Sequence, residues 1–403
     1  MKILQFITFL GTGPAGGEYI NSINKFDDFE CESKFVQEAI IRNYVDNISV
    51  VSIFCTKESK ELYSEILYEI LSGINKEFNK NIKINFEIIE WDIDFENFIQ
   101  KLYMVICSNK LIIDTTHSFR VLPTKLLFAL NYIESIKDLE IKKIFYGRFD
   151  NYSKVTTIIN YKDDYNKQKF SYILKQFDET LTINTNDLTE NEDLSKLINH
   201  MIKFNEIIQL CNFKEIENAS KNIVKSSEEI KENSQYYILT ALIDKIIYKL
   251  DFFRNERLNY KDKMIKFIDL LIETKNYQVA ITFIDQLYRV EIIRAIIYPN
   301  NYDIEISESF VNKAIGLNEN YVIYGFSQAI REKNAGRNYN NSAKYYEIID
   351  KKYKDNYEVL KSNNINVDRF YDKIRNRINH GEMIQVSNLD KELRMILNEI
   401  KRI

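Results

Sequence analysis

An arginine and a histidine near the carboxyl end of the chain are residue types that can cleave RNA without a metal. Arg375, Asn376 and His380 lie in the run "DKIRNRINHGE", where Gly381 follows as a helix terminator. Attack of a ribose 2′-hydroxyl on the adjacent phosphate needs a fixed cation for the developing charge and a proton carrier near neutral pH. Arginine serves the first role and histidine the second. The alternative interpretation is a solvated helix face with an Asn/Gly cap.

The spacing of these residues predicts a site that two chains share. Residues five positions apart on one helix point roughly 140° away from each other. A single copy of Arg375 and His380 is therefore a poor site, whereas two copies related by a two-fold axis can complete one. We predict a homodimer for this reason.

A glycine-rich segment follows the first apolar run of the chain. "FLGTGPAGGEYI", residues 9–20, has the G-x-G-x-x-G spacing of a dinucleotide fingerprint from Gly11 to Gly16. That fingerprint also needs an acidic residue at the end of the second strand, where this chain has Thr56 and Lys57. A nicotinamide-dependent enzyme is therefore disfavoured, and a tight turn without a ligand is the simplest alternative. We expect the first half of the segment to approach a ligand closely: Gly11, Thr12 and Gly13.

Two more polar segments follow strand patterns in the same part of the chain. In "IIDTTHSFR", residues 112–120, Asp114 ends a strand, and hydroxyls, an imidazole and backbone N–H groups then open the next helix, which is a natural anion site. "FYGRFD", residues 145–150, brings a glycine and an arginine to the end of another strand. His117 taken alone is equally well explained as an ordinary loop histidine. Because ligands bind at the carboxyl ends of strands in such sheets, we predict a phosphate-binding rim there. Its candidate residues are Thr115, Thr116, His117, Ser118, Phe119, Arg120, Gly147 and Arg148.

These segments must be positioned by two different kinds of structure. Strand patterns at 2–10, 48–56, 82–91, 110–116, 142–149 and 155–161 alternate with helical spacing at 32–45, 58–74, 95–108 and 119–135. The alternation predicts a Rossmann-like, mostly parallel, doubly wound sheet. The polar insertion at 18–33 precedes the first helix. Residues 161–170 and 184–196 are polar and turn-rich, so we expect a boundary there, and nearly everything after about 196 is helical.

Composition narrows the class of protein. The chain has 403 residues and 45% hydrophobic content, enough for two domains, and a net charge of −4 that gives no global basic field for nucleic acid. Its four cysteines are far apart and it has three histidines, so we expect no metal site and a reducing, cytoplasmic setting. No apolar run approaches the length of a membrane span, and the N-terminus goes directly into a strand pattern, so we expect neither a membrane-spanning segment nor a signal peptide.

The sequence resembles the CRISPR-associated CARF–HEPN ribonucleases, ancillary effectors of type III CRISPR antiviral defence. The likeness covers "FLGTG", "FVQEAI", "FCTKES", "DTTHSFR" and "FYGRFD" in the sheet part and "RNRINHG" in the helical part. It implies a CARF domain at 1–180 that dimerises and binds a cyclic oligoadenylate, most often the tetramer. It implies a HEPN domain at 181–403, with connecting helices at roughly 196–275, that this binding activates allosterically. Ser118 departs from the family, which commonly has glycine at that position.

The resemblance also implies a role for each candidate residue. Arg375, Asn376 and His380 would be the catalytic residues of a metal-independent endoribonuclease that cleaves single-stranded RNA, with no cofactor. Gly11 to Gly13, Thr115 to Arg120 and Gly147–Arg148 would line the messenger pocket. A ring with an even number of phosphates can share the two-fold symmetry of a dimer. Two alternatives stay open: a ring nuclease that degrades the cyclic oligoadenylate, and a non-catalytic messenger sensor whose helical domain binds a partner.

Overall fold

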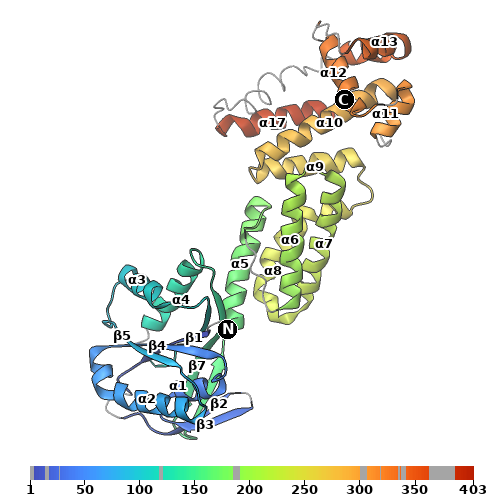
Figure 1. The fold of residues 1–403 in the computed structure, drawn as a ribbon. Coiled ribbons are helices and arrows are strands. Elements are labelled where there is room, and N and C mark those ends of the chain that lie inside the picture. Colours follow the sequence, from blue (N-terminus) through green and yellow to red (C-terminus); the bar gives the residue numbers. More distant parts are fainter. Residues whose placement is uncertain are drawn as a thin grey trace. The chain divides into compact units, whose positions relative to one another are not determined.

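The chain divides into two compact units, Met1–Gln168 and Lys169–Ile403 (Figure 1). The computed structural model describes the chain apart from residues 1–3, 14–17, 27, 118–120, 185–190, 300–305, 318, 335, 337–341 and 363–385. An α/β unit is followed by a helical unit, which confirms the predicted fold class. The functional division at 180/181 stays a prediction. Within the described part of the chain, no helix is long and apolar enough to cross a membrane.

The first unit is built on one eight-stranded sheet in the order β3-β2-β8-β7-β6-β1-β4-β5. The strands are β1 (Leu4–Leu10), β2 (Ser22–Phe26), β3 (Phe29–Ser33), β4 (Ile48–Cys55), β5 (Lys83–Ile88), β6 (Lys110–Asp114), β7 (Glu140–Asp150) and β8 (Val155–Asn160). β7, β6, β1, β4 and β5 form a parallel core with β1 in its middle. β8 is antiparallel to β7 and parallel to β2, and β2 and β3 form an antiparallel pair at the edge.

Helices cover both faces of this sheet. α1 (Val36–Asn43) and α2 (Lys57–Glu77) lie on one face, and α3 (Phe95–Val105) and α4 (Val121–Glu134) lie on the other (Figure 1). β1 shows why: all its residues are buried, with Phe6 in the core under α1 and α2 and Ile7 in the core under α3 and α4. A strand buried on both faces reads as a continuous apolar run. The doubly wound arrangement is therefore confirmed.

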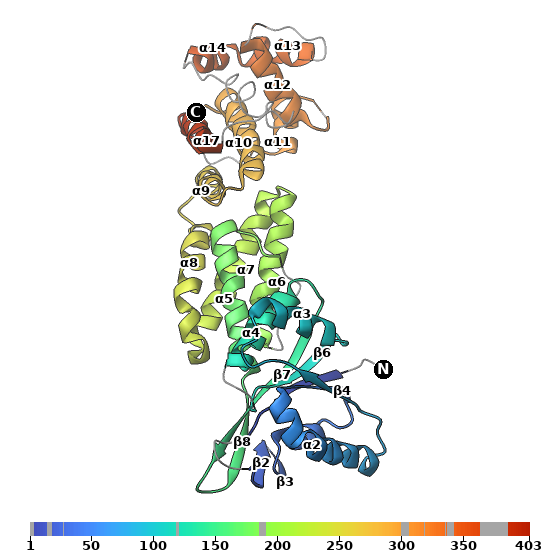
Figure 2. The ribbon, with the colours of Figure 1, turned by 90° about the vertical axis from the view of Figure 1, so that its left-hand side faces the viewer.

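The edge hairpin of β2 and β3 differs from the sequence-based prediction. Residues 18–33 were expected to be a polar insertion, but most of them extend the sheet beyond β8 (Figure 2). The side chains that β2 buries include the polar Ser22 and Asn24. The Asn24 amide donates to the backbone carbonyls of Ser22 and Ser33 at 3.2 and 3.1 Å, which compensates its burial. Because this buried face is polar, hydrophobic periodicity did not reveal the strand.

A helix replaces the turn-rich segment that was expected after β8. α5 (Lys162–Thr180) includes all but the first residue of 161–170, a segment whose polar composition had suggested a loop. Its apolar side chains Phe170, Leu174 and Phe177 recur at helical spacing and are buried in the core of the second unit. The apolar side chains of α5 are few and are separated by lysines and aspartates, so the sequence predicted a loop where the structure has a helix.

The second unit is helical throughout its described residues. Its elements after α5 are α6 (Glu192–Gln209), α7 (Phe213–Glu232), η1 (Ser234–Leu239), α8 (Thr240–Leu250), η2 (Asp251–Arg254), α9 (Tyr260–Glu273), α10 (Tyr277–Ile297), α11 (Glu308–Ile315), α12 (Val322–Asn334), α13 (Ala343–Lys352), α14 (Lys354–Ser362) and α17 (Val386–Lys401). α6, α7 and α8 pack side by side (Figure 2), and α10 packs against α9, α12, α14 and α17. α10 is thus the central helix of the distal part of this unit. Even its charged side chains Arg289, Glu291 and Arg294 are buried, and they form ion pairs.

Candidate functional site

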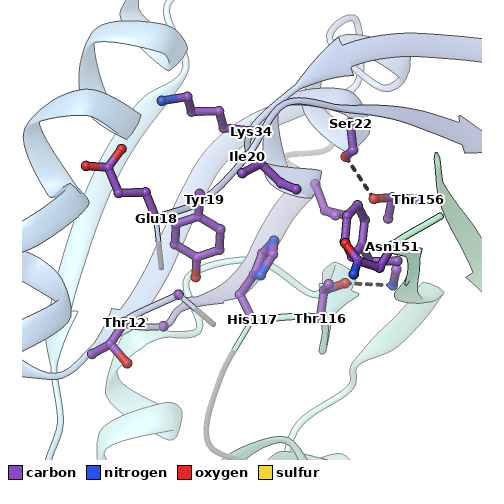
Figure 3. A pocket seen from close by; sticks show the side chains of 15 residues that line it. Thr12, Glu18, Tyr19, Ile20, Ser22, Lys34, Thr116, His117, Asn151 and Thr156 are labelled. Carbon is purple, nitrogen blue, oxygen red and sulfur yellow. Dashed lines mark hydrogen bonds between the residues drawn. The ribbon is translucent and has the colours of Figure 1, made fainter. Parts of the chain in front are cut away.

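A cavity of about 780 Å³ opens at the point where the sheet reverses its direction of winding. From β1 the chain adds β4 and β5 on one side, and later β6 and β7 on the other. The switch point therefore lies between the carboxyl ends of β1 and β6, which is where open α/β sheets bind ligands. The loop after β1, the segment before β2, the start of α1, the end of β6 and the β7–β8 hairpin all contribute to the lining (Figure 3).

The glycine loop forms one side of the cavity. Gly11, Thr12 and Gly13 leave β1 directly and line the cavity. Gly13 has a φ of 82°, in the left-handed region that glycine adopts without strain. A side chain at Gly13 would therefore strain the loop, and the backbone N–H groups of Gly11 and Gly13 hydrogen-bond to the Tyr19 hydroxyl. Gly16, the third glycine of the apparent fingerprint, lies outside the described residues.

Tyr19 packs beside the glycine loop, and its ring also contacts His117. The ring centroids of Tyr19 and His117 are 5.0 Å apart in an edge-on arrangement (Figure 3). The rings of Phe35 and Tyr63 complete the aromatic cluster, with centroids 5.0 and 4.8 Å from that of Tyr19. Burial raises the pKa of the Tyr19 phenol to about 12, although backbone hydrogen bonds from the glycine loop act against this rise. Tyr19 is therefore a neutral hydroxyl at the base of the cavity.

A buried carboxylate fixes the end of β6. Asp114 is fully buried, and its Oδ2 accepts a hydrogen bond from the Thr8 hydroxyl at 2.7 Å. Its Oδ1 accepts from the backbone N–H of Thr116 at 3.0 Å and from the Thr116 hydroxyl. Thr116 Oγ1 in turn accepts from the backbone N–H of Gly147 at 2.8 Å (Figure 3). Burial raises the pKa of Asp114, and these hydrogen bonds oppose the rise. The network holds Thr116 in place at the cavity floor.

The two residues on either side of Thr116 have different environments. Thr115 does not line the cavity: it is buried, its hydroxyl donates to the Phe145 carbonyl at 3.0 Å, and it contacts the Tyr161 hydroxyl at 2.8 Å. His117 lines the cavity, and its Nε2 is buried without a hydrogen-bond partner among the described residues. Burial lowers the pKa of His117 to about 4. The imidazole is therefore neutral at physiological pH and offers a hydrogen bond rather than a charge.

The β7 residues lie inside a strand and not at its end, which corrects the expectation for Gly147 and Arg148. Gly147 lines the cavity, and a Cβ there would lie only 2.9 Å from a methyl group of Val36 and 3.0 Å from one of Thr156. Successive residues of a strand point to opposite faces. Because Gly147 and Phe149 face the cavity, Arg148 points away from it and is exposed.

Sequence reasoning missed several residues that line the cavity. Ser22 and Thr156, on neighbouring strands, are linked through their hydroxyls at 2.9 Å, and Asn151 lies beside them at the β7–β8 turn (Figure 3). Lys34 and Glu18 supply one positive and one negative charge among the described lining residues. Glu18 and Ser22 belong to the segment that was expected to be an insertion, Lys34 follows it directly, and Asn151 and Thr156 belong to the β7–β8 hairpin; no motif in the sequence marks them.

Several predicted residues lie outside the described part of the chain. Ser118, Phe119 and Arg120 belong to residues 118–120, and Arg375, Asn376 and His380 belong to residues 363–385. Their roles stay predictions. Among the described residues, no group of histidine, cysteine, aspartate or glutamate side chains is arranged to hold a metal ion.

Comparison with known proteins finds similarity among solved structures only. No family model matches the chain, and no curated protein matches it in sequence. Among solved structures, the chain is similar to Enterococcus italicus Csm6 bound to cyclic hexa-2'-fluoro-hexa-dAMP, at 10% identity over 99% of this chain and 94% of that chain, with a TM-score of 0.36.

Proposed function

We propose that this protein is a metal-independent endoribonuclease that a cyclic oligoadenylate switches on. The observation that carries the proposal is the cavity at the switch point, where the glycine loop and neutral hydrogen-bonding groups meet. The likeness of "FLGTG", "DTTHSFR" and "RNRINHG" to CARF–HEPN ribonucleases supports the same function.

The chemistry of the cavity suits the phosphates of such a ring. Backbone N–H groups of a glycine turn bind phosphate oxygens through directed hydrogen bonds. The hydroxyls of Thr12 and Thr116 and the neutral imidazole of His117 add uncharged groups, and Lys34 adds a cation at the rim. Phosphate binding here needs no broadly basic surface, which agrees with the net charge of −4.

The proposed nuclease chemistry rests on the residues of the "RNRINHG" run. Arg375 would stabilise the charge of the phosphorane, and His380 would carry the proton. Asn376 precedes His380 by four residues, and on a helix this spacing would let it orient the imidazole. The composite site requires two chains, so the protein acts as a homodimer and the ring would bind the active arrangement of that dimer more tightly than the resting one.

An exposed apolar stripe on α4 supports the dimer. Val121, Phe128 and Tyr132 are 42%, 59% and 55% exposed and follow one another at helical spacing. Large exposed apolar patches on soluble proteins mark interaction surfaces. A second copy of the chain would cover this stripe at a two-fold axis, where each α4 meets the other.

Cleavage of a labelled single-stranded RNA in the presence of EDTA tests the nuclease assignment. We expect His380→Ala and Arg375→Ala each to lower the ring-activated rate by roughly 10²-fold or more. His200→Ala is the matched control, because His200 lies in α6 and hydrogen-bonds to Ser226 at 2.9 Å. The control should cleave at the wild-type rate. An unchanged rate in His380→Ala would contradict the proposed mechanism.

A further inference from the structure

One helix, α5, carries the chain from the sheet unit into the helical unit. Its residues up to Gln168 belong to the sheet unit, and those from Lys169 onward belong to the helical unit. The helix is continuous across this division, and its sequence contains neither glycine nor proline. Because backbone hydrogen bonds join each turn of a helix to the next, a movement imposed on one end of α5 is transmitted to the other.

The residue that precedes α5 is hydrogen-bonded to the neighbour of a cavity residue. The Tyr161 hydroxyl lies 2.8 Å from Thr115 Oγ1, and the Thr115 hydroxyl donates to the Phe145 carbonyl at 3.0 Å. A hydroxyl has one proton to donate, so Tyr161 must be the donor to Thr115. Burial raises the pKa of the Tyr161 phenol, so this proton stays in place at neutral pH. Thr115 is joined by a peptide bond to Thr116, which lines the cavity.

Both ends of α5 are also hydrogen-bonded to other helices. Near its start, Tyr165 is 5% exposed and places its hydroxyl 2.6 Å from Glu134 Oε2 on α4. At its end, the Thr180 carbonyl accepts from the side-chain amide of Asn276 at 2.7 Å. Asn276 directly precedes α10, which packs against α9, α12, α14 and α17. The carboxyl end of α5 therefore contacts the start of the central helix in the distal part of the helical unit.

We propose that α5 is the element through which an occupied cavity acts on the helical unit, and that the hydrogen bond from Tyr161 to Thr115 is required for this action. The inference rests on the proposed function, and it names a regulatory residue that does not touch the ligand. A phosphate oxygen that accepts from the Thr116 hydroxyl takes that donor from Asp114. The end of β6 then shifts, and Thr115 transmits the shift to Tyr161 and to the first turn of α5.

Tyr161 allows transmission to be separated from binding. It does not line the cavity, so removal of its hydroxyl leaves the binding surface unchanged. Phenylalanine at this position keeps the aromatic ring that packs against the core under α3 and α4. Tyr161→Phe therefore removes one hydrogen bond without opening a hole in the core. The expected product is a folded protein that binds the ring and responds to it weakly.

Two measurements on the full-length protein test this role: ring affinity by isothermal titration calorimetry, and the ratio of RNA cleavage rates with and without the ring. The rings of three to six adenylates are titrated first, and the ring that binds best is used. Tyr161→Phe should keep the wild-type affinity within about twofold while the ratio falls about three- to tenfold, the loss expected for one hydrogen bond. Thr115→Val removes the same hydrogen bond, so the double variant should lose no more than the larger single loss.

Hydrogen–deuterium exchange reports the same coupling without RNA cleavage. In the wild type, ring binding should change the exchange rates in α5 and at the start of α10 as well as in the sheet unit. In Tyr161→Phe the change should be confined to the sheet unit. Tyr172→Phe is the matched control on α5, because the Tyr172 side chain is 60% exposed, and it should respond as the wild type does. Circular dichroism confirms that each variant is folded.

The possible results separate this inference from the proposed function. Tyr161→Phe with the wild-type activation ratio and exchange response overturns the role of α5 and leaves the proposed function intact. Ring affinity that falls as much as activation overturns it too, because the hydrogen bond then only shapes the cavity. A ring that changes exchange in α5 of the wild type but causes no RNA cleavage contradicts the nuclease and supports the coupling. If no ring binds the wild type, the proposed function and this inference fall together.

Discussion

Acid should destabilise the sheet unit through His117, and the size of the effect follows from its burial. The pKa of His117 is lowered to about 4 in the folded protein, from 6.5 in an unfolded chain. Between these values the unfolded chain binds more protons, so the free energy of unfolding falls as the pH falls below 6.5. Each pKa unit is worth about 1.4 kcal/mol, and roughly one and a half units separate pH 6.5 from pH 5. We therefore expect a loss of about 2 kcal/mol between pH 7 and pH 5 from this residue alone.

Urea unfolding followed by tryptophan fluorescence measures this loss. Trp91 is the single tryptophan of the chain and belongs to the sheet unit, so its fluorescence reports that unit. In His117→Gln, which cannot be protonated, the fall in stability between pH 7 and pH 5 should be smaller than in the wild type by about 2 kcal/mol. His200→Gln removes a histidine of the helical unit and should leave the pH dependence of the Trp91 transition unchanged. Equal pH dependence in His117→Gln and the wild type would refute the reasoning.

Three further perturbations probe the site and the dimer. Gly147→Ala forces a methyl group against side chains 2.9 to 3.1 Å away, so we expect the free energy of unfolding in urea to fall by about 1–3 kcal/mol and ring binding to weaken. The control is Gly73→Ala on α2, where nothing lies within 4 Å of the added methyl group and no stability should be lost. Equal stability of the two variants would contradict the steric clash at Gly147. Asp114→Ala removes the acceptor that the backbone N–H and the hydroxyl of Thr116 share, which should cost about 1–3 kcal/mol and weaken ring binding. Unchanged affinity in calorimetry would show that this hydrogen-bond network does not position Thr116 for the ligand. Phe128→Glu on the α4 stripe should turn dimer into monomer in sedimentation velocity and abolish cleavage, whereas an intact dimer would remove that stripe from the interface.

The parallel core of the sheet was predictable because burial alone dictates it. β1 and β4 are buried almost throughout, so their residues are apolar whichever face they point to. β2 escaped prediction because it buries the polar Ser22 and Asn24, whose hydroxyl and amide N–H groups hydrogen-bond to neighbouring strands. α5 escaped because its apolar stripe is short among charged residues. Both cases depend on tertiary partners that a single sequence does not display.

The candidate site was predictable at the level of strand ends but not of individual side chains. The carboxyl ends of parallel strands meet at one edge of a sheet, and this rule alone predicted that the segments after β1 and β6 would lie close together. The cavity lining includes both segments: Gly11 to Gly13, Thr116 and His117. Arg148 does not line the cavity, since a one-residue step from Gly147 reverses the direction of a side chain in a strand. Thr115, just after β6, does not line it either, because its hydroxyl is held by the Phe145 carbonyl and the Tyr161 hydroxyl. Asn151 was missed because it belongs to a turn whose position depends on the β7–β8 register.

RNA cleavage as a function of ring concentration tests the central claim most directly. The purified wild-type protein is given labelled single-stranded RNA in EDTA, with and without rings of three to six adenylates. The proposed function predicts slow cleavage without a ring and a saturable increase with one ring size, and this increase should be absent in His380→Ala. Cleavage that is equally fast with and without every ring, or absent under all these conditions, would contradict activation by a cyclic oligoadenylate.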